Sequence, residues 1–83
     1  MSEINLDKIL EVLKEDGVEL PDLENFEIDA SLGEQGFNSM MQADLYLTLG
    51  EYYEVDLVSV DEERLRSFQE IIDCITRLRS SEP

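Results

Sequence analysis

The sequence has 83 residues, 42% of them hydrophobic, and carries six Lys and Arg against 21 Asp and Glu, for a net charge of −15. A chain of this length can bury only roughly 60% of its unfolded surface, so we expect one domain over residues 1–83, with a single core over about 4–78. The charge disfavours binding to nucleic acid or anionic membranes, and the lack of His, with only one cysteine (Cys74), excludes an intrachain disulfide and the usual zinc-ligand spacings.

The first predicted element is an amphipathic helix over residues 4–15, which Gly17 ends. Its apolar residues recur at i, i+3, i+4 and i+7 and are Leu6, Ile9, Leu10 and Leu13. Residues 18–36 contain Pro21 and show no sustained period, which predicts a long ordered loop. We expect its apolar side chains to pack onto the helices; they are Val18, Leu20, Leu23, Phe26, Ile28 and Leu32.

A second helix is predicted to begin at Ser39, because Asn38 is a favoured N-cap residue. Leu45, Leu49 and either Tyr52 or Tyr53 recur at helical spacing and form its buried stripe. Gly50 inside this helix is a local weakness of roughly 1 kcal/mol relative to Ala. A different face of the same helix carries Met40, Ala43, Asp44, Leu47 and Glu51.

Two capping boxes divide the last third of the chain, Ser59-x-x-Glu62 and Ser67-x-x-Glu70. The first predicts a short helix that ends near Arg66, and the second predicts a longer helix over residues 68–78. No segment alternates as a strand does. The predicted fold is therefore all-α: a four-helix bundle of three longer helices and one short third helix, with a long loop between helices one and two.

Ser39 is the residue whose placement suggests chemistry. The turn at Gly36 delivers its hydroxyl to the first position of a helix, where free amide groups and the helix dipole stabilise a bound anion such as a phosphoester. A catalytic serine needs a partner base, and the chain has no His to supply one. We therefore expect Ser39 to be an attachment point and the isolated chain not to be an enzyme.

Residues 32–40 read Leu-Gly-Glu-Gln-Gly-Phe-Asn-Ser-Met and resemble the attachment motif of acyl carrier proteins, Leu-x-x-Leu-Gly-x-Asp-Ser-Leu. In this sequence Asn38 stands in place of the usual Asp, Met40 in place of Leu, and Gln35 in place of an apolar residue. The order of a helix, a long loop, an acidic helix, a short helix and a closing helix is also similar, so the resemblance covers residues 4–78. The aligned motif residues are Leu32, Gly36, Ser39 and Met40.

The resemblance implies that a phosphopantetheinyl transferase, with magnesium, transfers 4′-phosphopantetheine from coenzyme A to Ser39, with Asn38 part of the attachment site. It further implies that the second helix contacts basic patches on partner enzymes. These partners would be acyl-transfer, ligase or synthase enzymes of fatty-acid, polyketide or related biosynthesis. A sequestered acyl chain would lie beneath Tyr46, Leu65 and Ile72, which fit ordinary core positions equally well. The residues expected to contact partners are Met40, Ala43, Asp44, Leu47 and Glu51.

The charge distribution is compatible with that reading and with one other. From Glu15 through Glu63 there are fifteen acidic residues and no Lys or Arg, a surface that attracts basic partners. An acidic helical interaction module that is never modified would carry the same surface, and the uncharged Asn38 favours it. A calcium loop over residues 56–67 is excluded, because Val58 and Val60 occupy ligand positions. Without a targeting signal or a spanning apolar segment, we expect a cytoplasmic monomer that binds no metal.

Overall fold

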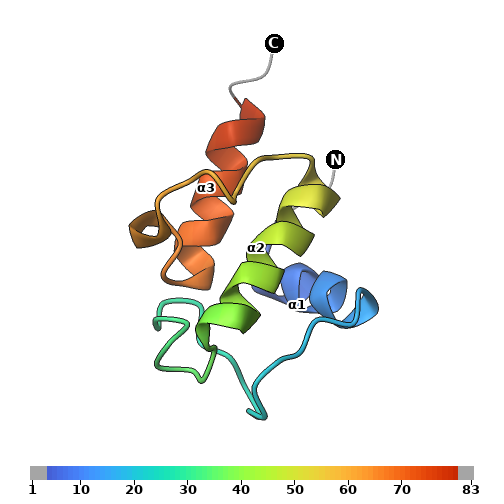
Figure 1. The fold of residues 1–83 in the computed structure, drawn as a ribbon, viewed down its shortest axis with the longest axis vertical. Coiled ribbons are helices and arrows are strands. Elements are labelled where there is room, and N and C mark those ends of the chain that lie inside the picture. The colour runs from blue at the N-terminus through green and yellow to red at the C-terminus, as the bar shows by residue number, and fades with distance from the viewer. Residues whose placement is uncertain (1–3, 81–83) are drawn as a thin grey trace.

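The computed structural model describes residues 4–80, apart from the side chain of Glu62. Within them are three α-helices, α1 (Leu6–Glu15), α2 (Ser39–Tyr53) and α3 (Phe68–Ser80), and a 3₁₀ turn, η1 (Glu62–Arg64). α1 packs against both α2 and α3, and η1 packs against α3. Figure 1 shows α2 across the centre of the molecule, with α3 on one side and α1 on the other. None of the helices described is long and apolar enough to cross a bilayer.

The predicted four-helix bundle is wrong in its helix count, because residues 4–80 contain three α-helices. The only regular secondary structure in these residues is helical, and they contain no strand. The predicted third helix is only the three-residue turn η1. Its expected N-cap, Ser59, is held instead by the carboxylate of Asp56, which accepts from the Ser59 hydroxyl at 2.7 Å and from its N–H at 3.2 Å. Such a side-chain turn competes with a helix start. The residues left between this turn and Ser67, which precedes α3, form only the 3₁₀ turn η1.

The predicted starts of α2 and α3 are confirmed by their caps. Asn38 caps α2, and Ser67 precedes α3 with its Oγ accepting from the Glu70 N–H at 3.2 Å. Asn5 caps α1, so this helix begins at Leu6 and not within the expected residues 4 and 5. Each cap satisfies an amide that has no partner inside its helix.

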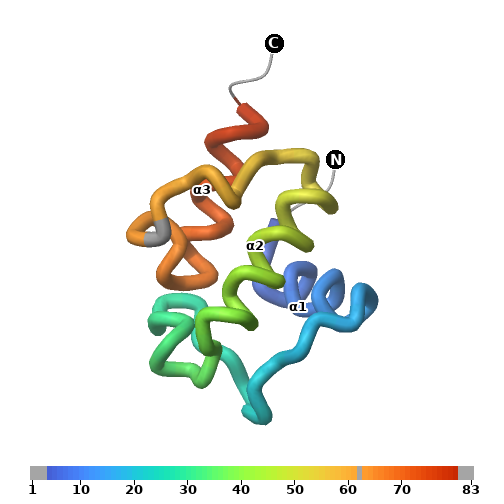
Figure 2. Tube along the Cα trace, in the orientation of Figure 1, coloured from blue at the N-terminus to red at the C-terminus, as the bar shows by residue number. Residues whose placement is uncertain are grey.

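One hydrophobic core joins the three helices, the long loop and the α2–α3 connection. Figure 2 shows the backbone path of these segments. In α2 the period left two tyrosines open, and Tyr53 is the one that is buried. The loop packs as predicted except at Leu23, which is 42% exposed. The fully buried side chains of the core are Ile9, Leu13, Leu32, Leu45, Leu49, Leu57, Leu65, Phe68, Ile71 and Ile75.

Gly50, which helix propensity marks as a weak point, is required by a close approach of the chain. After α2 the backbone reverses at Glu54, whose φ is 57°, and the Val55 N–H donates to the Gly50 carbonyl at 2.9 Å. A Cβ built on Gly50 lies 2.8 Å from the Val55 carbonyl oxygen, closer than real Cβ atoms come. The glycine therefore permits the reversal that leads the chain back along α2.

Gly50→Ala is expected to lower the free energy of unfolding by about 1–3 kcal/mol, because the clash outweighs the roughly 1 kcal/mol by which Ala favours a helix. Urea unfolding followed by circular dichroism measures this. Gly33→Ala is the matched control: a Cβ there has no neighbour within 4 Å, so the change should stay within about 0.5 kcal/mol. A more stable Gly50→Ala protein would mean that the reversal adjusts freely.

The hydroxyl of Tyr53 is buried and has no hydrogen-bond partner within the described residues. Its ring packs edge-on against Tyr52, with centroids 4.9 Å apart, and the Arg79 guanidinium lies 5.7 Å from the ring centroid. Burial raises the pKa of Tyr53 above its ordinary value, with the neighbouring Tyr52 adding to the shift. An unpaired buried hydroxyl destabilises the fold.

Tyr53→Phe is expected to raise the free energy of unfolding by up to about 1 kcal/mol at neutral pH. Because the folded protein holds the phenol proton to higher pH, the wild type loses stability above about pH 10, as the unfolded tyrosine ionises first, and the variant should lose less. Unfolding curves between neutral and alkaline pH test both points. Tyr46→Phe, which removes a hydroxyl bonded to the Leu65 carbonyl, should instead destabilise by about 1 kcal/mol.

Candidate functional site

Ser39 is the first residue of α2, and its side chain is exposed. The helix begins there because Asn38 is extended, with φ −86° and ψ 177°, and its Oδ1 accepts from the Met41 N–H at 2.8 Å. No acidic residue lies in the first turn of α2. The positive end of the helix is therefore open to an anion attached to Ser39.

The path of the chain into Ser39 is fixed by one glycine and one buried aromatic ring. Gly36 has a φ of +99°, a conformation that L side chains rarely adopt. Phe37 is buried, and its ring lies 5.9 Å from that of Phe26 and 5.8 Å from that of Phe68, centroid to centroid. The motif glycine and the anchored ring thus hold the turn that presents Ser39.

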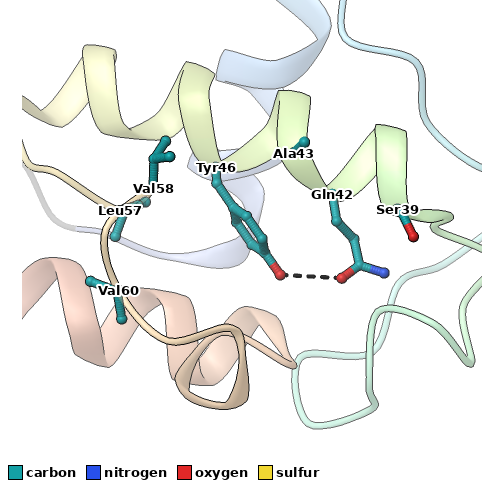
Figure 3. A pocket seen from close by; sticks show the side chains of 7 residues that line it. All are labelled: Ser39, Gln42, Ala43, Tyr46, Leu57, Val58 and Val60. Atoms are coloured by element: carbon teal, nitrogen blue, oxygen red, sulfur yellow. Dashed lines mark hydrogen bonds between the residues drawn. The ribbon is translucent and has the colours of Figure 1, made fainter.

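A cavity of about 170 Å³ opens beside Ser39, between α2 and the chain that leads from α2 to η1. Figure 3 shows Ser39 at one end of it and Val58 and Val60 toward the other. Of the three residues suggested for contact with an acyl chain, only Tyr46 lines this cavity, while Leu65 and Ile72 are buried in the core. The lining residues are Ser39, Gln42, Ala43, Tyr46, Leu57, Val58 and Val60.

The polar groups on the cavity wall bind one another and the backbone around them. The Tyr46 hydroxyl lies 2.9 Å from the Leu65 carbonyl oxygen and 3.2 Å from Oε1 of Gln42, as Figure 3 shows for the second pair. Nε2 of Gln42 donates to the Phe37 carbonyl at 3.0 Å. This network ties α2 to the turn before Ser39 and to the chain before α3, and it leaves Ala43 and the aliphatic side chains as the apolar wall.

The five residues expected to contact partners lie on one exposed stripe of α2. All five are exposed, with Met40 at 75% and Leu47 at 51%. Apart from the adjacent pair Ala43 and Asp44, successive members fall three or four residues apart, the spacing of one helix face. The stripe consists of Met40, Ala43, Asp44, Leu47 and Glu51, and it begins one residue after Ser39.

Val58 extends this stripe, although no sequence pattern predicted that it would. It is 66% exposed, and it lines the same surface depression as Leu47 and Glu51. Its position depends on how the α2–α3 connection lies along α2, which no periodicity reports. Because Val58 shares one depression with Ala43 and another with Leu47, it enlarges the apolar part of the surface.

The chain contains no His, and within residues 4–80, leaving aside the side chain of Glu62, no carboxylate is hydrogen-bonded to the Ser39 hydroxyl. In the same part of the chain, the side chain of Glu62 aside, no three His, Cys, Asp or Glu residues are grouped to hold a metal ion.

Comparison of the chain with protein-family models, curated proteins and solved structures found no significant match. The resemblance of residues 32–40 to a carrier motif is therefore not extended by similarity to any particular relative. The function is inferred from the residues around Ser39, the cavity beside it and the exposed face of α2.

Asn38→Ala is expected to lower the free energy of unfolding by about 1 kcal/mol through loss of the α2 cap, whereas Asn38→Asp should keep the cap and the stability. Urea unfolding of both variants measures this. Asn5→Ala is the matched control, because Asn5 caps α1 through the same 2.8 Å bond, from the Lys8 N–H, far from Ser39 in the chain. Unchanged stability in Asn38→Ala would show that Ser39 begins α2 for another reason.

Proposed function

We propose that the chain is an acyl carrier protein that bears 4′-phosphopantetheine on Ser39 and presents acyl thioesters to biosynthetic enzymes. The observation that carries this proposal is the joint placement of three features. An exposed serine starts a capped helix, a cavity with Ala43 and three aliphatic side chains in its wall opens beside it, and an exposed apolar and acidic stripe begins at the next residue. Each feature serves one stage of carrier function: attachment, shelter and docking.

The residues around Ser39 fit the proposed group. Its exposed hydroxyl can be reached by a modifying enzyme, and the first turn of α2 has no carboxylate to repel a phosphodiester. Ala43, Leu57 and Val60 offer apolar contacts to whatever enters the cavity. The arm, when bound, supplies a terminal thiol that carries acyl groups as thioesters. The protein positions the arm and supplies no catalysis of its own.

The exposed stripe supports docking to enzymes with basic patches. Met40 and Leu47 give it an adaptable apolar centre, and Asp44 and Glu51 flank that centre with charges that can pair with Lys or Arg. The net charge of −15 accelerates encounter with such partners without requiring tight complexes. The partners proposed are a phosphopantetheinyl transferase and acyl-transfer, ligase or synthase enzymes, met by a monomeric carrier in the cytoplasm.

A second function, an acidic interaction module that is never modified, is favoured by one observation. Asn38 keeps the cap but lacks the charge of the Asp usual in the carrier motif, and that Asp contributes to recognition by the modifying transferase. The same exposed stripe of α2 would then bind a basic partner directly. Ser39 would serve only as the first residue of the helix.

The deciding measurement is the intact mass of the protein after incubation with coenzyme A, magnesium and several phosphopantetheinyl transferases. We expect the mass to rise by one phosphopantetheinyl group in the wild type and to stay unchanged in Ser39→Ala. The substitution is suited to this purpose because Ser39 is exposed and Ala is tolerated at a helix start. Equal unfolding curves would confirm that the control is folded.

Asn38→Asp separates the two functions further. If the wild type is loaded and the variant is loaded faster, Asn38 slows a working carrier. Loading of the variant alone would indicate a carrier-like protein that has lost its arm, and loading of neither would favour the interaction module. A mass increase that survives Ser39→Ala would remove Ser39 from the site.

A further inference from the structure

Gln35 is a buried polar side chain in the turn that leads to Ser39. It is only 7% exposed, at a motif position where the resemblance expects an apolar residue. Its carboxamide is fully used: Oε1 accepts from the Glu27 N–H at 2.7 Å, and Nε2 donates to the carbonyls of Glu27 and Ala30 at 3.0 and 3.1 Å. One side chain thereby pairs three backbone groups of a loop that has no secondary structure of its own.

The backbone of Gln35 belongs to the turn itself. Its N–H lies 3.2 Å from the Ser31 carbonyl oxygen and 3.1 Å from that of Leu32, and the Phe37 N–H also donates to the Leu32 carbonyl, at 3.0 Å. Figure 2 shows this turn directly before the start of α2. The side chain thus joins the turn that presents Ser39 to a loop segment eight residues earlier.

That loop segment is held from its other side by α3. The Gln69 N–H donates to the Ile28 carbonyl at 3.0 Å, and Ser31 forms an antiparallel bridge with Ser67. Residues 27–31 therefore lie between Gln35 and the start of α3. We call this set of contacts, from the turn at Gln35 through residues 27–31 to the start of α3, the brace, and the Gln35 side-chain bonds complete it.

We infer that Gln35 is a positioning residue, which holds the turn before Ser39 in the geometry that the loading enzyme requires. This inference rests on the proposed function and names a residue that sets the rate of loading. A preformed turn spares the enzyme the ordering of a mobile one, so that more encounters place the Ser39 hydroxyl in line with the phosphorus it must attack. In that transfer the serine oxygen bonds to the phosphorus that carries the pantetheine, the diphosphate bridge of coenzyme A breaks, adenosine 3′,5′-bisphosphate leaves, and the hydroxyl proton passes to a base of the transferase or to solvent. Without the carboxamide, three backbone groups lose their partner and the turn separates from the loop.

The test compares Gln35→Met with the wild type at a temperature where both are fully folded. Amide exchange of Glu27, whose N–H the side chain binds, should accelerate at least about tenfold, while exchange of Leu49 in the core of α2 should follow global stability. The kcat/KM for arm transfer to Ser39 should fall about tenfold or more. Gln69→Met is the matched control, because the one side-chain partner of Gln69 among the described residues is the exposed Asp73, and the substitution should change neither value.

Gln35→Glu provides a second variant that stays isosteric. When protonated, the new carboxyl group can accept from the Glu27 N–H and donate to one carbonyl; when ionised, it can only accept. Burial raises the pKa of such a carboxyl group. Once ionised, the carboxylate would face the carbonyl oxygens of Glu27 and Ala30, which lie 3.0 and 3.1 Å from Nε2 in the wild type, and this repulsion would drive the side chain out of the turn. The protection factor of the Glu27 amide should therefore be lost as the pH rises through the raised pKa and restored as the pH falls below it. A general loss of packing would show no such reversal.

Three outcomes would overturn the inference. Unchanged Glu27 exchange in Gln35→Met would mean that the brace is not formed, and faster exchange with unchanged kcat/KM would make Gln35 purely structural. If no transferase loads the wild type, the proposed function fails and takes the role in loading with it, while the exchange data still report whether the brace exists. The two failures are thus distinguishable.

Discussion

The backbone of residues 17–38 has no helix or strand to pair it, and the way its polar groups find partners decides where Ser39 lies. The Leu32 N–H donates to the Arg66 carbonyl at 2.6 Å, and the Ile28 carbonyl accepts from Gln69 at 3.0 Å. The loop that follows α1 is therefore hydrogen-bonded to the start of α3, the last helix of the chain. Buried backbone groups must be paired, and these bonds position the loop against α3. The loop leads directly into α2, so they also fix where α2 begins.

α2 must satisfy two opposite requirements at once. One face fills the core with Leu45 and Leu49, while another leaves Met40 and Leu47 exposed to solvent. Exposed apolar residues invite self-association, but a net charge of −15 repels a second copy of the chain. The same charge attracts a basic partner. In the proposed carrier, the acidic composition and the exposed stripe would therefore act together, favouring a partner of opposite charge and disfavouring a second copy of the chain.

Features that depend on neighbouring residues in the chain could be predicted, and features that depend on packing could not. The caps at Asn38 and Ser67 were read correctly because a cap acts within three residues. The cap at Ser59 was misread because Asp56 competes for it over the same distance. The period of α2 allowed either Tyr52 or Tyr53 inside. Nothing local indicated that Gln35 would be buried, because its three partners lie five to eight residues away in an irregular loop.

The absence of a full third helix shapes the cavity. Because residues 55–61 do not coil, they run along α2, and Leu57, Val58 and Val60 become one wall. That wall is held at its start by the bond to the Gly50 carbonyl and at its far end by the bond from the Tyr46 hydroxyl to the chain before α3. A glycine inside a helix and a hydroxyl in a core are each unfavourable in isolation. Gly50 lets the connection approach α2 without a clash, and the Tyr46 hydroxyl is stabilised by its bond to the Leu65 carbonyl. Together they hold the connection along the cavity beside Ser39.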